Sequence, residues 1–110
     1  MVMRQPRTES LVESRLLRYM KGIPGLVHFK MGRDGWPDRI VCYRGVFIGI
    51  EIKSERINHE PTVRQTQRIE QIKRVGGLAG VVRSEAELEQ FLHRVDNWYH
   101  DGGGFPWSQR

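Results

Sequence analysis

The sequence predicts an α/β fold in one domain, with helices packed on a mixed sheet of four strands. Two β-rich runs, 39–43 and 46–53, flank the pair Arg44-Gly45, and a glycine at the second position of a two-residue loop favours a hairpin. Segments with helical spacing of apolar residues stand before, between and after the strands. The order helix, three strands, helix, strand, helix therefore predicts an antiparallel hairpin followed by a crossover helix and a last strand.

Capping and stop signals set the expected bounds of the other elements. Thr8 is a suitable N-cap for a first helix that ends at Gly22, and Thr62 is suitable for a second helix that continues to about 75. Gly76-Gly77 ends that helix, and the Ser84–Glu87 stretch reads as a capping box that opens the third. Further strands are expected at 26–31 and 78–83. We expect a flexible basic arm at 1–7, one folded domain at 8–97, and a Gly/aromatic tail at 98–110.

Composition limits the classes of protein to which the chain can belong. With 110 residues, of which 38% are hydrophobic and 28% charged, it can bury one modest core. No apolar run approaches the roughly 20 residues of a membrane span, and residues 1–13 contain no apolar block of a signal peptide. Cys42 is the single cysteine, which excludes disulfides and cysteine-based zinc sites within one chain. We therefore expect a reducing, cytoplasmic location, and the net charge of +5 favours a nucleic-acid partner.

The hairpin places ionisable side chains on one face of the sheet. If Tyr43 pairs with Val46, Asp38 lies directly opposite Glu51, with the two Cβ atoms about 5 Å apart. Strand alternation puts Glu51 and Lys53 on this face and the isoleucines 48, 50 and 52 on the opposite, core-facing one. Two carboxylates held so close repel each other unless a divalent cation or a shared proton neutralises them.

Two interpretations of this cluster follow from the residues. A carboxylate pair, a metal ion and a lysine suit the stabilisation of a phosphoryl-transfer transition state and the activation of a water molecule. The alternative is a cross-strand salt-bridge cluster on a solvated face of the sheet. The spacing of Asp38, Glu51 and Lys53 allows both interpretations.

Other polar side chains are expected near this face. Glu9 and Glu13 lie on the same side of the first helix as core residues, although carboxylates near a helix N-terminus also complement the helix dipole. Gln65 lies on the helical stripe directed toward the sheet, whereas Gln67 points roughly the opposite way. Its amide can orient a water or a carboxylate, or it can satisfy a backbone group.

Together these motifs resemble those of known nucleases. Pro37-Asp38, followed after twelve residues by Glu51-Ile52-Lys53, resembles the PD-(D/E)XK superfamily. With Gln65 and the later Gly76-Gly77, the chain resembles the VRR-NUC family of small phage and bacterial nucleases, whose first motif reads Gly-x-Pro-Asp. The resemblance covers about residues 9–91, and Trp36 stands where a small aliphatic residue is usual.

The resemblance implies a restriction-endonuclease-like core of order αβββαβ and a set of site residues. Asp38, Glu51 and the main-chain carbonyl of Ile52 would hold Mg²⁺, for which Mn²⁺ would substitute. Glu9, or Glu13 in its place, would complete the acidic site, Lys53 would act on the water and the phosphate, and Gln65 would orient. The side chains expected to contact DNA are Lys30, Arg33, Arg64 and Arg68.

The expected activity is Mg²⁺-dependent cleavage of structured or branched DNA, and the expected assembly is a homodimer. Stand-alone members of the family resemble Holliday-junction resolvases, which implies a four-way junction as substrate and a phage or bacterial origin. A flap or nicking nuclease is the alternative, as is a non-catalytic nucleic-acid-binding module of the same fold. A base-specific restriction-like nuclease is disfavoured because so short a chain leaves little room for a recognition element.

Overall fold

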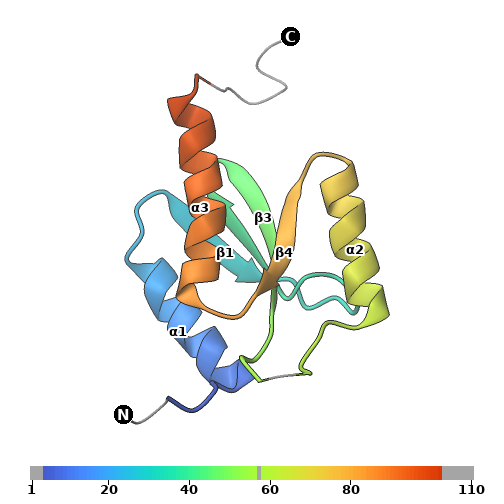
Figure 1. Ribbon diagram of the computed structural model, residues 1–110. Coiled ribbons are helices and arrows are strands. Elements are labelled where there is room, and N and C mark those ends of the chain that lie inside the picture. Colours follow the sequence, from blue (N-terminus) through green and yellow to red (C-terminus); the bar gives the residue numbers. More distant parts are fainter. Residues whose placement is uncertain (1–3, 57, 103–110) are drawn as a thin grey trace.

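Three helices and four strands follow one another in the expected order. The structure is a computed structural model that describes residues 4–56 and 58–102 (Figure 1). Within those residues no helix combines the length and the apolar character needed to cross a membrane. The elements are α1 (Glu9–Lys21), β1 (Leu26–Lys30), β2 (Arg39–Tyr43), β3 (Val46–Ile52), α2 (Val63–Arg74), β4 (Leu78–Val82) and α3 (Glu85–His100).

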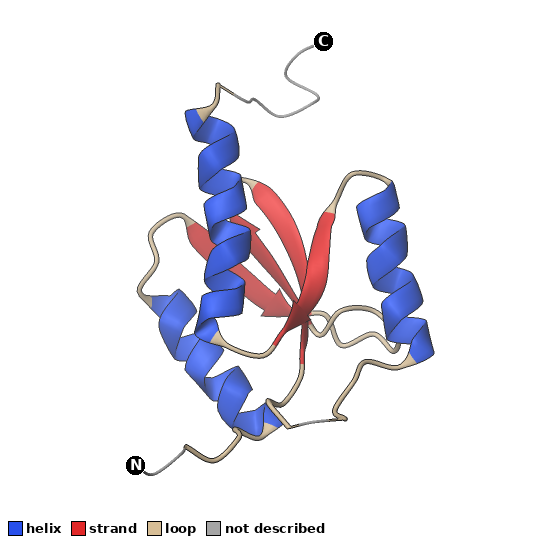
Figure 2. Ribbon diagram, viewed as in Figure 1, coloured by secondary structure: helices blue, strands red, loops and turns tan. Residues whose placement is uncertain are grey.

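The strands form one mixed sheet in the order β1-β2-β3-β4. The first three strands pair antiparallel, and β4 runs parallel to β3. α2 makes the crossover that a parallel pair requires. Figure 2 shows α1 and α3 on one side of the sheet and α2 on the other, so the molecule has three layers. The predicted α/β class is confirmed.

The main core lies between the sheet and the layer of α1 and α3. Ile48, Ile50 and Ile52 of β3 are at most 1% exposed, which confirms that these side chains form the core face of the strand. The two helices bury their apolar stripes against this face because residues three and four apart share one side of a helix. These stripes consist of Val12, Leu16 and Met20 on α1 and Leu88, Leu92 and Val95 on α3.

Side-chain caps define the starts of the helices. Thr8 accepts a hydrogen bond from the amide of Leu11, as an N-cap does. Ser84 accepts from the amide of Glu87, but the Glu87 carboxylate accepts from Arg83 instead of from Ser84. The capping box predicted at α3 therefore lacks its reciprocal bond, because Glu87 reaches one residue further back. The reciprocal box is present at α2 instead.

Residues near both ends of the described chain contact the folded domain. Arg4 and the backbone amide of Arg7 both donate to the carboxylate of Glu55, and the hydrogen bond from Arg4 lowers the pKa of Glu55 to about 2. Residues 4–7 are therefore held on the domain. At the other end α3 continues through His100, and the Tyr99 hydroxyl donates to the carbonyl of Arg44 over 2.7 Å.

The helix thus extends three residues past the predicted boundary at 97, because its hydrogen-bond ladder continues to Asp101. Trp98 and Tyr99 belong to α3 and not to the tail. Phe105 and Trp107, the other tail aromatics of interest, lie outside the described residues.

Candidate active site

The β2–β3 hairpin brings Asp38 and Glu51 together. Arg44 and Gly45 have φ angles of 52° and 83°, the left-handed conformations that a two-residue hairpin turn requires. Tyr43 pairs with Val46, and each step back along β2 is matched by one step forward along β3 as far as Arg39 and Ile50. One further step places Asp38 opposite Glu51, as the sequence predicted.

Contacts on both sides hold Asp38 in this position. Its Oδ2 atom accepts a hydrogen bond of 2.8 Å from the backbone amide of Ile52, the residue after Glu51. Pro37, just before it, packs over Gly49, where a Cβ atom would lie 3.0 Å from the proline ring. Because Gly49 has no side chain, Pro37 packs closely on the strand. This packing positions the next residue, Asp38.

Glu51 is a buried carboxylate with an incomplete set of partners. The residue is 1% exposed. Its Oε2 atom accepts a hydrogen bond of 3.0 Å from Gln65 and lies 3.5 Å from the Lys53 ammonium. Its Oε1 atom is buried and has no hydrogen-bond partner among residues 4–56 and 58–102. Burial and then the neighbouring Asp38 carboxylate raise the pKa of Glu51 to about 8, and Lys53 opposes this shift.

The donor set fits a hard divalent cation. A buried oxygen without a partner is costly, and a cation between the two carboxylates would remove both that cost and their repulsion. Mg²⁺ binds through one or two carboxylates and keeps water and substrate oxygens as its other ligands. Asp38, Glu51 and the adjacent Ile52 carbonyl supply oxygens of the required kind. Across residues 4–56 and 58–102, no group of three or more His, Cys, Asp or Glu side chains is arranged to hold a metal ion.

Gln65 is oriented by the first turn of α2. The Oε1 atom of Gln65 accepts a hydrogen bond from the backbone amide of Thr62, and the backbone amide of Gln65 donates to the Thr62 hydroxyl. This capping box assigns the oxygen and nitrogen of the side chain, so the NH₂ group must face the sheet. There it donates to Glu51. Gln65 therefore satisfies a backbone group and orients a carboxylate at the same time, while Gln67 is exposed.

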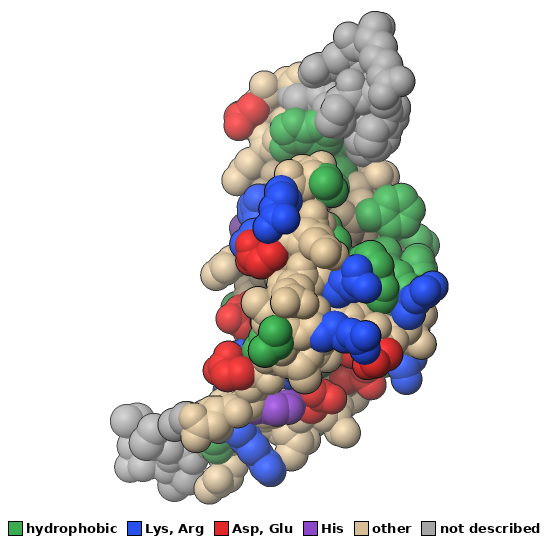
Figure 3. All heavy atoms as spheres, turned by 90° about the vertical axis from the view of Figure 1, so that its right-hand side faces the viewer, with side chains coloured by type: hydrophobic (Ala, Val, Ile, Leu, Met, Phe, Trp, Pro, Cys, Tyr) green, Lys and Arg blue, Asp and Glu red, His purple; other side chains and the backbone are tan. Residues whose placement is uncertain are grey.

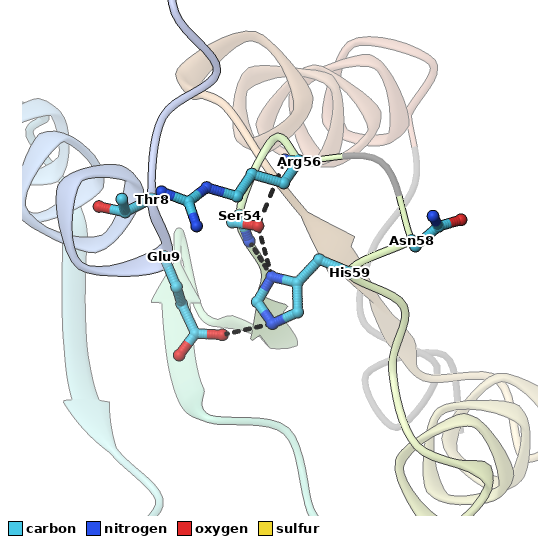
Figure 4. A pocket seen from close by; sticks show the side chains of 6 residues that line it. All are labelled: Thr8, Glu9, Ser54, Arg56, Asn58 and His59. Atoms are coloured by element: carbon cyan, nitrogen blue, oxygen red, sulfur yellow. Dashed lines mark hydrogen bonds and ion pairs between the residues drawn. The ribbon is translucent and has the colours of Figure 1, made fainter.

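Glu9 lies apart from the two carboxylates. Its side chain is 50% exposed, and its Oε1 atom lies 3.7 Å from Nε2 of His59 (Figure 4). Glu13, its predicted alternative, is half-buried on the same helix. Glu9 lines a pocket of about 300 Å³ whose other lining residues are Thr8, Ser54, Arg56, Asn58 and His59.

His59 is a polar residue near this region that the sequence did not indicate. The backbone amide of Ser54 donates to its Nδ1 atom over 2.9 Å, and the Ser54 hydroxyl lies 2.5 Å from the same atom. Nδ1 therefore acts as an acceptor, and the ring proton is on Nε2, which faces Glu9. The available sequence signal is a serine directly after Lys53 and a histidine five residues later. Both lie in a loop, where no helical or strand periodicity indicates which side chains meet.

The basic residues predicted to contact DNA divide into two groups. Lys30 at the end of β1 and Arg33 in the following loop are exposed. Arg64 pairs with Asp34 over 2.9 Å, and the Arg68 guanidinium lies 4.6 Å from the centre of the Trp36 ring. The two arginines of α2 thus contact the loop that leads to Asp38.

Comparison with known proteins supports the family resemblance through structure. No protein-family model matches the chain, and no curated protein matches it. A solved structure described as “VRR_NUC domain” is similar, with a TM-score of 0.64 and 26% sequence identity, over 77% of this chain and 94% of that one. The resemblance to the VRR-NUC family is therefore confirmed, and the fold is that of a nuclease-type domain.

Proposed function

We propose that this VRR-NUC-type domain is a metal-dependent endonuclease that hydrolyses phosphodiester bonds in DNA. The observation that carries the proposal is the buried Glu51 carboxylate, which faces Asp38 and has one oxygen to which no described residue donates a hydrogen bond. A carboxylate kept out of water beside another is costly to the fold unless it serves a ligand. A lysine in contact with the same carboxylate adds the positive charge that phosphoryl transfer needs.

Each residue has a distinct part in the proposed reaction. Asp38, Glu51 and the Ile52 carbonyl would hold Mg²⁺ or Mn²⁺, which would supply a Lewis acid and lower the pKa of a bound water. The Lys53 ammonium, 3.5 Å from Glu51, stabilises the charge that develops on the phosphate and positions the water. Gln65 keeps the Glu51 carboxylate in place. Glu9 completes the acidic site on substrate binding, which requires it to leave His59.

The proposed substrate is branched DNA, and a four-way junction in particular. This part of the proposal rests on likeness to stand-alone VRR-NUC domains and not on the site geometry. Two symmetric cuts in one junction need two sites in fixed relation, which a two-fold dimer supplies.

An apolar face of the sheet supports such a dimer. Pairing places Val27, Cys42 and Phe47 in one cross-strand row, and Phe29, Ile40 and Gly49 in the next. Val27, Phe29 and Phe47 are 68%, 50% and 63% exposed. Rows of apolar side chains without charges are self-complementary in a two-fold arrangement. The face lies on the same side of β3 as Glu51, so a dimer formed through it would carry both sites near one surface.

One cleavage assay tests the function. The purified protein is incubated with labelled four-way junction, flap, single-stranded and linear duplex DNA, with and without Mg²⁺ or Mn²⁺. We expect metal-dependent cleavage with preference for the junction, and losses of about 10²-fold or more for Asp38→Asn and for Lys53→Ala, with the fold intact. Glu51→Gln should lose activity similarly and bind Mn²⁺ more weakly by calorimetry.

The other outcomes would replace the proposal. DNA binding without cleavage in any metal identifies a non-catalytic binding module. Cleavage of flaps or single nicks, with junctions left uncut, identifies the flap or nicking nuclease. Wild-type rates in the Asp38 or Lys53 variant overturn the site assignment.

A further inference from the structure

Trp36 and Arg68 form a stacked pair at the edge of the candidate site. The Arg68 guanidinium carbon lies 4.6 Å from the centre of the indole ring, within the range of a cation–π contact. A hydrogen bond of 3.0 Å from Arg68 to the Gln71 side chain holds the guanidinium in place. Both members of the pair keep part of their surface in solvent.

The chain places this pair next to the two carboxylates. Trp36 precedes Asp38 by two residues, so their Cα atoms are at most about 7 Å apart. Arg68 follows Gln65 by three residues on α2, so the two side chains are neighbours on one face of the helix. Gln65 donates to Glu51 from this face. The stacked pair therefore lies about one nucleotide's length from the acidic residues.

The loop that carries Trp36 contacts the first turn of α2 in the absence of a ligand. Gly35 has a φ of 83°, and a Cβ atom there would lie 2.6 Å from the Arg64 side chain. Arg64 also pairs with Asp34 in the same loop. Figure 3 shows this side of the molecule, where Lys and Arg side chains, together with Asp and Glu, lie beside hydrophobic ones. An aromatic–arginine pair that is already stacked in the free protein offers a planar ligand a preformed partner.

We propose that the Trp36–Arg68 pair is a stacking site for one unpaired nucleobase, next to the phosphate that is cleaved. Bases stack on indole rings and on guanidinium planes, and every base offers such a face, so the site tolerates any sequence. Bases inside a linear duplex are already stacked and paired, so they do not reach it. The inference rests on the proposed cleavage of branched DNA, in which the branch point interrupts the paired stack of the duplex arms, and it makes this pair a determinant of preference for DNA with a base outside that stack.

The test measures binding in the absence of divalent metal, separately from cleavage. Single-stranded and flap oligonucleotides carry the fluorescent base 2-aminopurine at one unpaired position, and a linear duplex carries it inside a pair. We expect quenching of the unpaired probe on binding to the wild type, and its loss in Trp36→Ala. This variant should bind unpaired DNA about tenfold more weakly and linear duplex within about twofold of the wild type.

Conservative variants keep the test decisive if Trp36→Ala unfolds. Trp36→Phe should retain most of the affinity, and Trp36→Leu, which is apolar without a π-system, should not. Arg68→Lys keeps the charge and loses the plane, so it should behave like Trp36→Leu. Arg74→Ala, on the exposed side of the same helix, is the matched control. It should weaken the binding of unpaired DNA and of duplex DNA to the same small extent.

The outcomes separate this inference from the proposed function. Equal losses of affinity for unpaired and duplex DNA in the Trp36 variants, or quenching that survives in folded Trp36→Leu, overturn the stacking site. The Trp36–Arg68 contact would then serve only to hold the loop against α2. If the wild type and the Trp36 variants cleave DNA with the same preference among substrates, the stacking site is overturned and the proposed nuclease activity stands. If it binds unpaired bases through Trp36 but cleaves nothing, the nuclease fails and the stacking site stands.

Discussion

At the scale of single residues, Glu51 defines the candidate site because its environment favours the neutral acid. The carboxylate is 1% exposed and faces Asp38, and one of its oxygens lacks a hydrogen-bond partner in the part of the chain that the structure describes. Gln65 and Lys53 satisfy only the other oxygen. The metal-free protein therefore holds a proton, or bears a repulsion, that a bound cation removes.

The stability of the metal-free protein should therefore depend on pH. Burial and Asp38 raise the pKa of Glu51 to about 8 in the folded protein, from 4.5 ordinarily. The folded state then binds more protons than the unfolded state between these values, so this contribution to stability is complete below about pH 4.5 and is lost as the pH rises through 8. We expect melting temperatures in EDTA to fall across this window, and to fall less in Glu51→Gln.

Comparison of the wild type with Glu51→Gln separates the contribution of Glu51 from that of the histidines, which both proteins share. Glu51→Gln keeps the size and hydrogen-bonding capacity of the side chain and removes only its titration. Parallel melting curves for the two proteins from pH 5 to 8 would show that Glu51 holds no additional proton.

Gln65 gives a second prediction at this scale. Its NH₂ group donates to Glu51, so Gln65→Ala should lower metal affinity and cleavage by about 10-fold to 100-fold, as the loss of a side chain that orients a metal ligand does. Gln67 is exposed on the same helix, and Gln67→Ala should leave both unchanged. Calorimetry with Mn²⁺ and initial cleavage rates measure the two effects. Equal losses at both glutamines contradict the orientation of α2.

At the scale of elements, the N-terminus of α2 joins helix stability to the site. Thr62 caps the helix and shares a reciprocal box with Gln65, whereas Ser84 caps α3, which packs on the opposite face of the sheet. Both caps satisfy amides of a first turn, but only the cap at α2 also holds a side chain that contacts Glu51.

Substitution of the two caps should therefore separate stability from activity. Thr62→Ala and Ser84→Ala should each cost about 1 kcal/mol of stability, seen as a lower melting temperature. Only Thr62→Ala should also reduce cleavage, because the first turn that orients Gln65 frays. Equal cleavage rates in the two variants, at a temperature where both are folded, would show that the cap does not act on the site.

At the scale of the whole molecule, the apolar sheet face predicts assembly. At least half of the surface of Val27, Phe29 and Phe47 is exposed. Phe47 also lines a groove of about 710 Å³, together with Val75, Leu78, Trp98 and other residues. Contiguous exposed apolar surface of this kind marks an interface more often than an ordinary surface.

We expect a homodimer at micromolar concentration by light scattering. Phe47→Ser should weaken it, because it removes an exposed aromatic side chain from the apolar rows. Val63→Ser changes a valine that is 75% exposed on α2 and serves as the matched control. Deletion of residues 101–110 should also weaken the dimer if the tail aromatics contribute. A monomer, with or without junction DNA, leaves the flap-type or single-nick nuclease as the better proposal.

The sequence by itself determined the elements and the central pair of carboxylates. The hairpin turn at Arg44-Gly45 sets the register, and strand alternation with period two sets the faces, so the placement of Asp38 against Glu51 required only counting. The helical stripe likewise directed Gln65 toward the sheet. These are local rules, in which a few neighbouring residues determine the backbone and its side-chain directions.

Only the tertiary structure decided which distant groups meet around this pair. It placed Glu9 against His59, stacked Arg68 on Trp36, and left one oxygen of Glu51 without a hydrogen-bond partner among the described residues. The loop between β3 and α2 and the loop before β2 have no period from which their positions can be read. Their side chains lie where packing of whole elements brings them, because contacts between residues far apart in the chain depend on the relative placement of the elements and not on local spacing.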